Sequence, residues 1–477
     1  MLFNSLEFFI FLPIVFTLYW LIGNNRIKQQ NLLIAVASYV FYGWWDWRFL
    51  FLILFSSLVD YTIGLKLNSE DKQSKRKVFL WVSICVNLGF LGFFKYYNFF
   101  VDSLVESFTF FGGQLSINTL NIILPVGISF YTFQTLSYTI DVYNKKLEPT
   151  KDFLGFMAFV SFFPQLVAGP IERATNLLPQ FHKKRQFVYE HAVDGLRQVL
   201  WGLFKKVVIA DNCAVYANTI FNNQDDYSGS TLLIGAFFFA FQIYGDFSGY
   251  SDIAIGISRL FGFNLKRNFA FPYFSRDIAE FWRRWHISLS TWFRDYLYIP
   301  LGGSRGGIKM KIRNTFIIFI VSGFWHGANW TFVVWGALNA LYFLPLLLLN
   351  KNRVNTNLVA EGKYFPSFRE LFQMTTTFFI TLIAWIFFRA DNVTNAFIYI
   401  KNMFTANLFT KPEILPMTIL GLLIFFLAIE WLGRSGEYAI QKVDFLKKPI
   451  RWSFYFFLVI LIFSFTGEQQ EFIYFQF

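Results

Sequence analysis

The chain has 477 residues, of which 55% are hydrophobic and only 15% charged, and its formal net charge is +12. Soluble domains carry about a quarter charged residues and fewer apolar ones, so the composition excludes the water-soluble class. The basic residues lie in short loops between apolar runs, a pattern typical of membrane orientation signals, and nucleic-acid binding is therefore not expected.

The cysteines and histidines offer little for a disulfide framework or a metal site. Cys85 and Cys213 are the two cysteines and lie far apart within apolar runs, and the four histidines form no His-Glu-x-x-His pattern. The N-terminus lacks a basic region before the run 8–22, and no small-residue cleavage site follows it. This run is expected to be a retained first span rather than a signal peptide.

Apolar runs long enough to approach a membrane span, about 20 residues, follow one another along the chain. They lie at 7–22, 31–45, 48–65, 78–94, 120–140, 198–221, 231–258, 314–349, 371–388, 417–433 and 452–466. A shorter run at 153–169 is expected to dip in without crossing. We predict an all-α, polytopic transmembrane helical bundle of about 11–12 spans, with re-entrant and interfacial helices, as one membrane domain over 1–477.

The run 314–349 is too long for one span. As a single helix it would extend about 54 Å, against a hydrocarbon thickness of about 30 Å. It must break, tilt or re-enter, and the polar stretch from His326 to Asn329 is the natural break.

The loops predict the orientation. The loop 66–77 carries five Lys and Arg residues, whereas 101–118 carries Asp102 and Glu106 and no basic residue. The first loop is therefore expected inside and the second outside, and alternation places the N-terminus outside. If 153–169 does not cross and 314–349 crosses twice, the basic stretches 141–152, 263–313 and 434–451 are also expected inside and the C-terminal tail outside.

His326 is an ionisable residue deep in an apolar run, which is a functional hypothesis by default. A neutral imidazole there can take the proton from an acceptor hydroxyl as that hydroxyl attacks a thioester carbonyl. Asn329, three residues on, would orient the ring or an oxyanion if the stretch is helical. The alternative, a core histidine bonded to a carbonyl, stays open at this point.

Residues 277–298 carry apolar side chains at helical spacing with charged residues opposite, which predicts one amphipathic helix on the cytoplasmic interface or in a funnel. Asp277 and Glu280 have the spacing of an N-terminal capping pair. His286 lies at the edge of the apolar stripe, which aims it inward, and both a structural and a functional role are open for it.

Three further stretches are polar or glycine-rich. The basic loop 301–307 suits phosphates and anionic lipid headgroups equally well, and it lacks the strand and helix that a hydrolase Gly-x-Ser-x-Gly turn needs. Asp246 and Asp252 interrupt one apolar run and Gln165 another. Polar groups at lipid depth need partners, so bonding between helices is the expected role of both carboxylates.

Five motifs occur together in the chain. They are Phe-Pro-Gln-Leu-Val-Ala-Gly-Pro-Ile at 163–171, Tyr-Gly-Asp-Phe-Ser-Gly-Tyr-Ser-Asp at 244–252, Arg-Arg-Trp-His-Ile-Ser-Leu-Ser-Thr-Trp-Phe-Arg at 283–294, Tyr-Ile-Pro-Leu-Gly-Gly at 298–303 and Gly-Phe-Trp-His-Gly at 323–327. With the opening 1–5 and the ending 472–477, they resemble the membrane-bound O-acyltransferase family, in its bacterial branch of alginate and peptidoglycan O-acetyltransferase membrane subunits.

The resemblance implies roles for particular residues. In that family a histidine deep in a tunnel-shaped bundle is catalytic, and it matches His326; a second functional histidine matches His286. The resemblance also implies acetyl-CoA as the donor co-substrate, with no tightly bound cofactor. Because Arg and Lys suit phosphates, we expect a cytoplasmic coenzyme A surface from the basic residues nearby. These are Lys266, Arg267, Arg283, Arg284, Arg294 and Arg305.

The implied reaction joins two sides of a bacterial cytoplasmic membrane. The acetyl group passes to an acceptor from outside, either a polysaccharide hydroxyl or a serine on a partner. In this branch the membrane subunit usually hands the group to an exported protein resembling an SGNH hydrolase. D-alanyl transfer to teichoic acid is an alternative within the family, and a transporter or flippase, or a scaffold without catalysis, is an alternative from another class.

Overall fold

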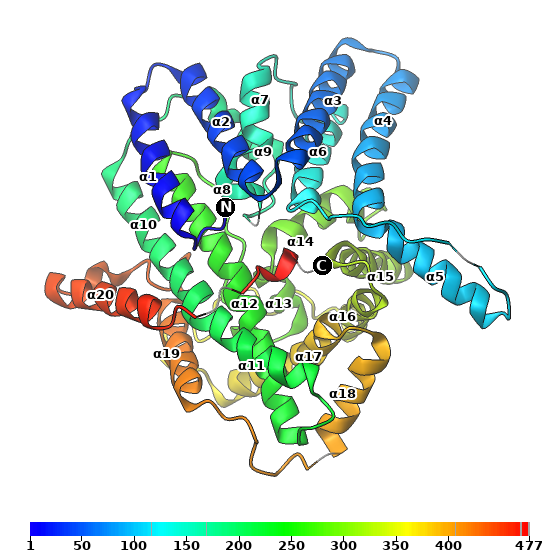
Figure 1. Cartoon of the computed structure of the whole chain (residues 1–477), viewed down its shortest axis with the longest axis vertical. Helices are drawn as coiled ribbons and strands as arrows, with labels where there is room; N and C mark the ends of the chain where they lie inside the picture. The colour runs from blue at the N-terminus through cyan, green and yellow to red at the C-terminus, as the bar shows by residue number, and fades with distance from the viewer. Residues whose placement is uncertain (116, 168, 406, 468–469, 476–477) are drawn as a thin grey trace. The chain divides into compact units, whose positions relative to one another are not determined.

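The structure is a computed structural model, and it describes residues 1–115, 117–167, 169–405, 407–467 and 470–475. All regular secondary structure within these ranges is helical, which confirms the predicted all-α class (Figure 1). The chain divides into two compact units. The first unit comprises Met1–Ala192 and Ser258–Leu265, and the second comprises Val193–Ile257 and Lys266–Phe477. One domain over 1–477 stays a prediction.

Several helices have the length and composition of membrane spans. In the described part of the chain five segments qualify: Ile27–Ser69, Gln73–Phe110, Gly229–Leu260, Trp330–Leu348 and Phe368–Arg389. Shorter apolar helices lie at Leu6–Leu21, Phe153–Leu166 and Met417–Gly433. The chain is thus a multi-pass membrane protein, in which exposed apolar side chains face lipid. The predicted total of 11–12 crossings stays a prediction.

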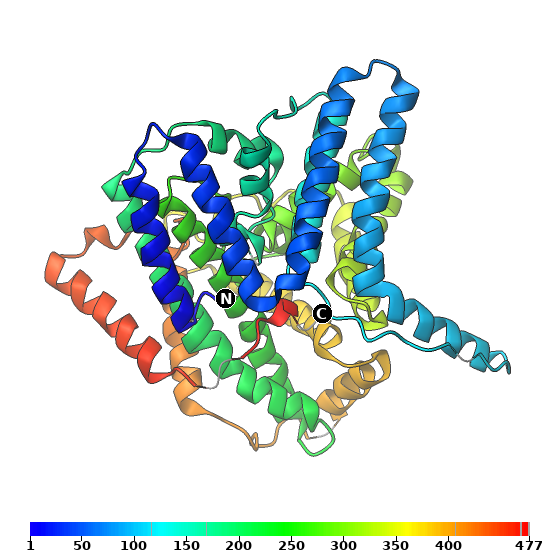
Figure 2. The same cartoon turned by 45° about the horizontal axis from the view of Figure 1, so that its top comes forward.

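The first unit consists of the N-terminal helices. They are α1 (Leu6–Leu21), α2 (Ile27–Asp46), α3 (Leu50–Ser69), α4 (Gln73–Leu91), α5 (Tyr97–Phe110), α6 (Ile128–Tyr143), α7 (Phe153–Val160), α8 (Phe163–Leu166) and α9 (Ala174–Leu177). Helices α3 and α4 form a long hairpin, which Figure 2 shows in blue. The apolar run 120–140 becomes helical only at α6, because Gly127 before it has a left-handed backbone with a φ of 74°.

The second unit contains both predicted histidines. Its helices are α10 (Tyr189–Leu203, which begins in the first unit), α11 (Asp211–Asn222), α12 (Gly229–Leu260, whose last three residues belong to the first unit), α13 (Ile278–Arg284), α14 (Ile287–Phe293), α15 (Gly307–His326), α16 (Trp330–Leu348), α17 (Phe368–Arg389), α18 (Val393–Thr405), α19 (Met417–Gly433) and α20 (Lys448–Ser464). A π-helical turn, η4 (Phe204–Ala210), joins α10 to α11, and a short 3-10 turn, η8 (Ile473–Phe475), follows the last helix.

The predicted break in 314–349 is confirmed. Helix α15 ends at His326, α16 begins at Trp330, and the two helices pack side by side as a hairpin (Figure 1). Gly323 and Gly336 permit this close packing, since a side chain on Gly323 would meet the carbonyl oxygen of Phe332. The break therefore places His326 at the tip of a tightly packed helix pair.

The predicted continuous helix over 277–298 is wrong. The chain forms α13, turns at His286, and continues as α14 and a π-helical turn, η6 (Arg294–Tyr298). His286 has a left-handed backbone with a φ of 43°, which ends α13. Part of the capping prediction is confirmed, because the Asp277 side chain accepts a hydrogen bond of 2.7 Å from the Glu280 amide.

Candidate active site

Two buried imidazoles lie close together in the second unit. The ring centroids of His286 and His326 are 6.4 Å apart. Their residues are 1% and 2% exposed, respectively. One histidine stands at the turn between α13 and α14, and the other is the last residue of α15. The fold thus brings together two residues that separate motifs had indicated.

Asn268 holds the strained turn that carries His286. Its backbone carbonyl accepts a hydrogen bond of 2.8 Å from the Ile287 amide. Its side-chain oxygen accepts two more from Ser288, from the amide at 3.2 Å and the hydroxyl at 2.8 Å. These bonds satisfy amides that the broken helix leaves open, so the turn is anchored without a glycine.

The His286 ring lies in an apolar environment. Its centroid is 4.6 Å from that of Phe247 and 5.9 Å from that of Trp325. Within the described residues neither ring nitrogen has a hydrogen-bond partner. Burial lowers the pKa of His286 to about 3, because an apolar environment disfavours the charged form. This imidazole is therefore neutral at pH 7.

His326 stands at a helix end whose following residues leave the helix. Asn329 caps α16: its side-chain oxygen accepts from the Thr331 amide at 3.0 Å, and its nitrogen donates to the Asp391 carbonyl at 2.8 Å. The condition for Asn329 to orient the histidine ring, a helix through both residues, is not met. Its observed role is to fix the connection between α15, α16 and the end of α17.

Aromatic rings surround His326. Its ring centroid lies 4.9 Å from that of Trp325, 5.0 Å from Trp335, 5.3 Å from Phe388 and 5.6 Å from Tyr474. These rings come from α15, α16, α17 and the C-terminal segment. We call them the aromatic enclosure. It leaves a reacting group little room beside the imidazole.

A cavity of about 780 Å³ lies against the same helices. Basic side chains, apolar rings and Ser322 all contribute to its lining. Its lining includes Trp282, Arg283, Arg294, Lys311, Phe319, Ser322 and Arg353. Ser322 is one helical turn before His326 on α15, a distance of about 6 Å along the helix. The lining does not include His326, and a continuous tunnel stays a prediction.

Two of the six predicted coenzyme A residues line this cavity, Arg283 and Arg294. Arg294 is exposed and pairs with its neighbour Asp295 at 2.7 Å. Arg283 donates to the backbone carbonyls of Asn352 and Asn355 at 2.9 and 2.7 Å. Its guanidinium therefore holds the loop between α16 and α17 as one wall of the cavity.

The other four predicted residues lie outside the lining. Arg284 forms an ion pair with Glu280 at 2.7 Å, and Arg267 donates to the carbonyl two residues on at 2.5 Å. Lys266 and Arg305 are exposed. A coenzyme A contact for these four residues stays a prediction.

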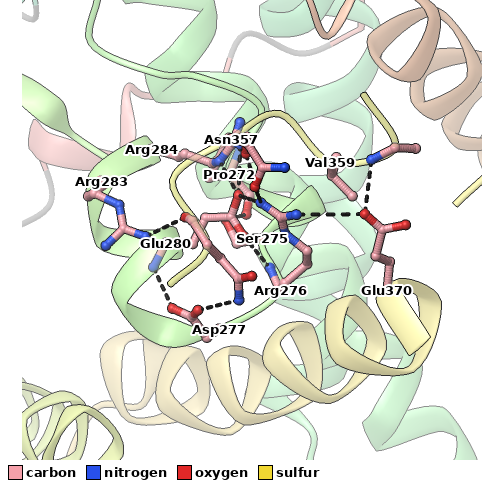
Figure 3. A network of polar contacts seen from close by, with 12 residues as sticks. Pro272, Ser275, Arg276, Asp277, Glu280, Arg283, Arg284, Asn357, Val359 and Glu370 are labelled. Carbon is pink, nitrogen blue, oxygen red and sulfur yellow. Dashed lines mark hydrogen bonds and ion pairs between the residues drawn. The ribbon is translucent and has the colours of Figure 1, made fainter. Parts of the chain in front are cut away.

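Figure 3 shows a polar network around the buried Arg276, close to the cavity residue Arg283. Arg276 lies between two carboxylates, with Glu280 at 3.0 Å and Glu370 at 3.6 Å. It also donates to the backbone carbonyl of Asn357 at 2.7 Å. The network joins α13, the loop after α16 and the start of α17, so the wall has a fixed position.

The two carboxylates of α12 bond to the helix beside it. Asp252 accepts from Gln198 at 2.8 Å and pairs with Lys205 at 2.5 Å. Asp246 pairs with Lys206 at 2.8 Å and also accepts from a backbone amide of the C-terminal segment. Both carboxylates therefore bond to neighbouring segments of the chain. The sequence prediction did not include either lysine.

Gln165 lies in α8 of the first unit. Its side chain is fully buried, and within the described residues neither its oxygen nor its nitrogen has a hydrogen-bond partner. A tunnel-lining role for it stays a prediction.

Sequence reasoning missed several residues around the histidines. Asn268, Trp335, Phe388 and Tyr474 carry no charge or pattern that separates them from the many other aromatic and polar residues. Arg353 stands in the loop between two apolar runs, where a basic side chain is ordinary. Tyr474 had one signal, since the ending 472–477 belongs to the motifs that carried the resemblance.

Comparisons with known proteins agree with these motifs. Residues 148–386 match the profile of MBOAT, the membrane-bound O-acyltransferase family. A protein of Pseudomonas aeruginosa named a probable alginate O-acetylase is 40% identical over 91% of this chain and 80% of its own length. The peptidoglycan O-acetyltransferase of Helicobacter pylori is 36% identical over 85% of this chain and 80% of its own length.

A more distant relative covers less of the chain. The teichoic acid D-alanyltransferase of Streptococcus thermophilus is 30% identical over 50% of this chain and 63% of its own length. The family match and the near full-length relatives confirm the predicted resemblance and the predicted enzyme class, an O-acyltransferase. The chain belongs to the membrane-bound O-acyltransferase family.

Proposed function

We propose that this protein moves an acetyl group from acetyl-CoA, bound at the cytoplasmic side, to a hydroxyl on the other side of the membrane, with His326 as the base. One observation carries the proposal. His326 of a buried imidazole pair, His286 and His326, stands one helical turn beyond Ser322, which lines a cavity with both basic and apolar walls.

The chemistry needs one proton carrier. The acceptor hydroxyl attacks the thioester carbonyl while the neutral His326 ring takes its proton. The tetrahedral intermediate then collapses, the carbon–sulfur bond breaks, and the imidazolium returns the proton to the leaving thiolate. The products are the acetyl ester and free CoA. His286, which burial keeps neutral, provides a second polar ring within reach of the oxyanion.

The cavity suits a donor with a charged head and an apolar arm. Arg294, Lys311 and Arg353 provide cations for phosphates, and Trp282 and Phe319 provide apolar walls. These basic residues belong to loops and helix ends that the charge pattern predicts to be cytoplasmic, where acetyl-CoA is made.

The aromatic enclosure supports a small acyl group. With Trp335 and Phe388 centred 5.0 and 5.3 Å from the His326 ring, a long chain has no space beside the base. The names of the relatives in Pseudomonas aeruginosa and Helicobacter pylori also specify acetyl transfer. An acetyl group satisfies both observations.

The acceptor is a cell-surface or cell-wall polysaccharide, or a serine on an exported partner that resembles an SGNH hydrolase and modifies the glycan. The relatives with near full-length matches are named for alginate and for peptidoglycan. We place the protein in the bacterial cytoplasmic membrane with its N-terminus outside, because the loop 66–77 is basic and 101–118 is not.

D-alanyl transfer to teichoic acid is the second candidate. It rests on the relative named for that reaction, which matches half of the chain. Purified protein in nanodiscs separates the candidates: acetyl-CoA with the acceptor should release CoA, whereas a D-alanyl carrier protein should not react.

The decisive variant is His326→Ala. It should reduce CoA release by about a hundredfold or more, the usual contribution of a general base. His191→Ala, which removes an exposed histidine, is the matched control and should retain turnover. Full turnover by His326→Ala in a folded protein would overturn the proposed chemistry.

A further inference from the structure

A buried charge cluster lies beneath the C-terminal segment. The Lys206 ammonium is 1% exposed and sits 2.7 Å from Asp211 and 2.8 Å from Asp246. The lysine belongs to the π-helical turn η4, and Asp246 to α12. One cation stands between two carboxyl groups, and their oxygens need further hydrogen-bond donors in this buried environment.

The C-terminal segment 470–475 supplies a further donor and also bonds the cation. The Ile473 amide donates to the second oxygen of Asp246 at 2.7 Å, and Lys206 donates to the Gln470 carbonyl at 3.2 Å. A buried backbone outside a regular helix needs polar partners for its amides and carbonyls. Cluster and segment therefore satisfy each other.

The anchored segment reaches the histidines. The C-terminal segment, red in Figures 1 and 2, contacts one turn of α12, residues 246–250. The rings of Phe472 and Tyr250 are 4.4 Å apart, as are those of Tyr474 and Phe247. The ring centroid of Tyr474 also lies 5.6 Å from that of His326. A contiguous set of contacts thus leads from the charge cluster to the aromatic enclosure.

We propose that Lys206 and Asp246 are positioning residues, which hold the C-terminal segment so that its end closes the aromatic enclosure around His326. The effect on turnover rests on the proposed function, whereas the anchoring itself does not. Loss of the anchor should release the segment, open the enclosure and lower kcat, while donor binding at the separate cavity is retained.

Cysteine labelling tests the anchoring without any enzyme activity. In a Cys85→Ser, Cys213→Ala background, a cysteine replaces the buried Ile473 side chain, and its reaction with a maleimide is timed in nanodiscs. Lys206→Met should raise the labelling rate by about a hundredfold, since breaking a buried pair is strongly unfavourable. Lys206→Arg should keep the slow rate.

Lys205→Met is the matched control. Lys205 is the adjacent buried lysine, and its ion pair is with Asp252 rather than with the cluster. Lys205→Met loses one buried ion pair and Lys206→Met loses two, so both variants should unfold at lower temperatures than the unmodified protein. Only Lys206→Met should expose residue 473. Equal labelling in the two variants would overturn the proposal.

A change on the segment side leaves the charge cluster intact. Ile473→Pro removes the amide N–H that donates a hydrogen bond to Asp246. Proline is tolerated at this position because residue 473 is the first of the η8 turn. A cysteine in place of the exposed Glu471 reports on this variant. Ile473→Pro should speed its labelling and lower kcat at an unchanged KM for acetyl-CoA, whereas Ile473→Ala should do neither. Unchanged labelling in Ile473→Pro would contradict the anchoring, and fast labelling with unchanged kcat would contradict the positioning role.

Discussion

Trp335 meets the ring of His326 edge-on, with centroids 5.0 Å apart and planes at 84°. On its other side Trp335 lies 5.6 Å from Trp282, which lines the donor cavity. The tryptophan therefore contacts both the proposed base and a side chain of the cavity lining, on the path that the proposed function gives to the acyl group.

Shortening this side chain should change the acyl selectivity. Trp335→Phe removes one ring beside His326, and each methylene that a pocket newly admits is worth about 1–3 kcal/mol of discrimination. The ratio of kcat/KM for butyryl-CoA to that for acetyl-CoA should rise about tenfold or more. Trp201→Phe, a buried tryptophan stacked on Phe204, is the control and should leave the ratio unchanged.

His286 should affect turnover more than donor affinity. Its ring has no hydrogen-bond partner within the described residues, so it is available to a reacting group. His286→Ala should lower kcat by about a hundredfold, as the loss of an oxyanion donor does, at a KM for acetyl-CoA within about twofold of the unmodified protein. Steady-state kinetics measure both. A rise in KM alone would assign His286 to donor binding instead.

The basic residues that line the cavity should affect the binding of acetyl-CoA rather than the chemical step. Lys311→Ala and Arg353→Ala each remove a cation from the lining. Each should raise the KM for acetyl-CoA about tenfold with little change in kcat, because a charge-assisted phosphate contact contributes about 1.5–3 kcal/mol. Lys309→Ala is the neighbouring control, since Lys309 is exposed and outside the lining. Equal KM values in all three variants would contradict the binding of acetyl-CoA in this cavity.

Asn268 should stabilise the turn at His286. Asn268→Ala leaves the Ser288 amide and hydroxyl without their acceptor. A buried donor without a partner costs about 1–3 kcal/mol, so the variant should unfold at a lower temperature and lose turnover as the turn relaxes. Ser288→Ala loses one of these bonds and should have the smaller effect. Thermal unfolding in detergent ranks the two.

The α15–α16 hairpin should not tolerate a side chain at its contact. A Cβ on Gly323 would press on the Phe332 carbonyl, so Gly323→Ala should destabilise the protein by about 1–3 kcal/mol. Gly421→Ala on α19 meets nothing within 4 Å and should be neutral or slightly stabilising. If both variants unfold at the same temperature, the contact between Gly323 and Phe332 is not tightly packed.

The sequence indicated the helical class, the break before Asn329 and both histidines, because each leaves a local mark. An apolar run marks a buried helix, and a histidine within such a run is rare enough to be noticed. The turn at His286 left no such mark. Helical spacing continues through 277–298, and only the bonds from Asn268, distant in sequence, favour a left-handed backbone there.

The charged residues show a second limit of sequence reasoning. A pattern can indicate that Arg283 is near a phosphate site, but not that two backbone carbonyls already occupy its guanidinium. Likewise, Lys206 looks like a basic residue at the edge of a span, and only the fold surrounds it with two carboxylates and a carbonyl. Such roles depend on which groups the tertiary structure brings within 3 Å.

Helix α15 also fixes the distance between a basic residue of the cavity and the proposed base. Lys311 lines the basic part of the cavity and His326 ends the same rigid helix, and 15 residues at 1.5 Å each separate them by about 22 Å. Under the proposed function, the donor has to hold its phosphates and its reactive carbon far apart to engage both. Acetyl phosphate, in which the two groups share one oxygen, is therefore too short to serve as a substitute, however reactive it is.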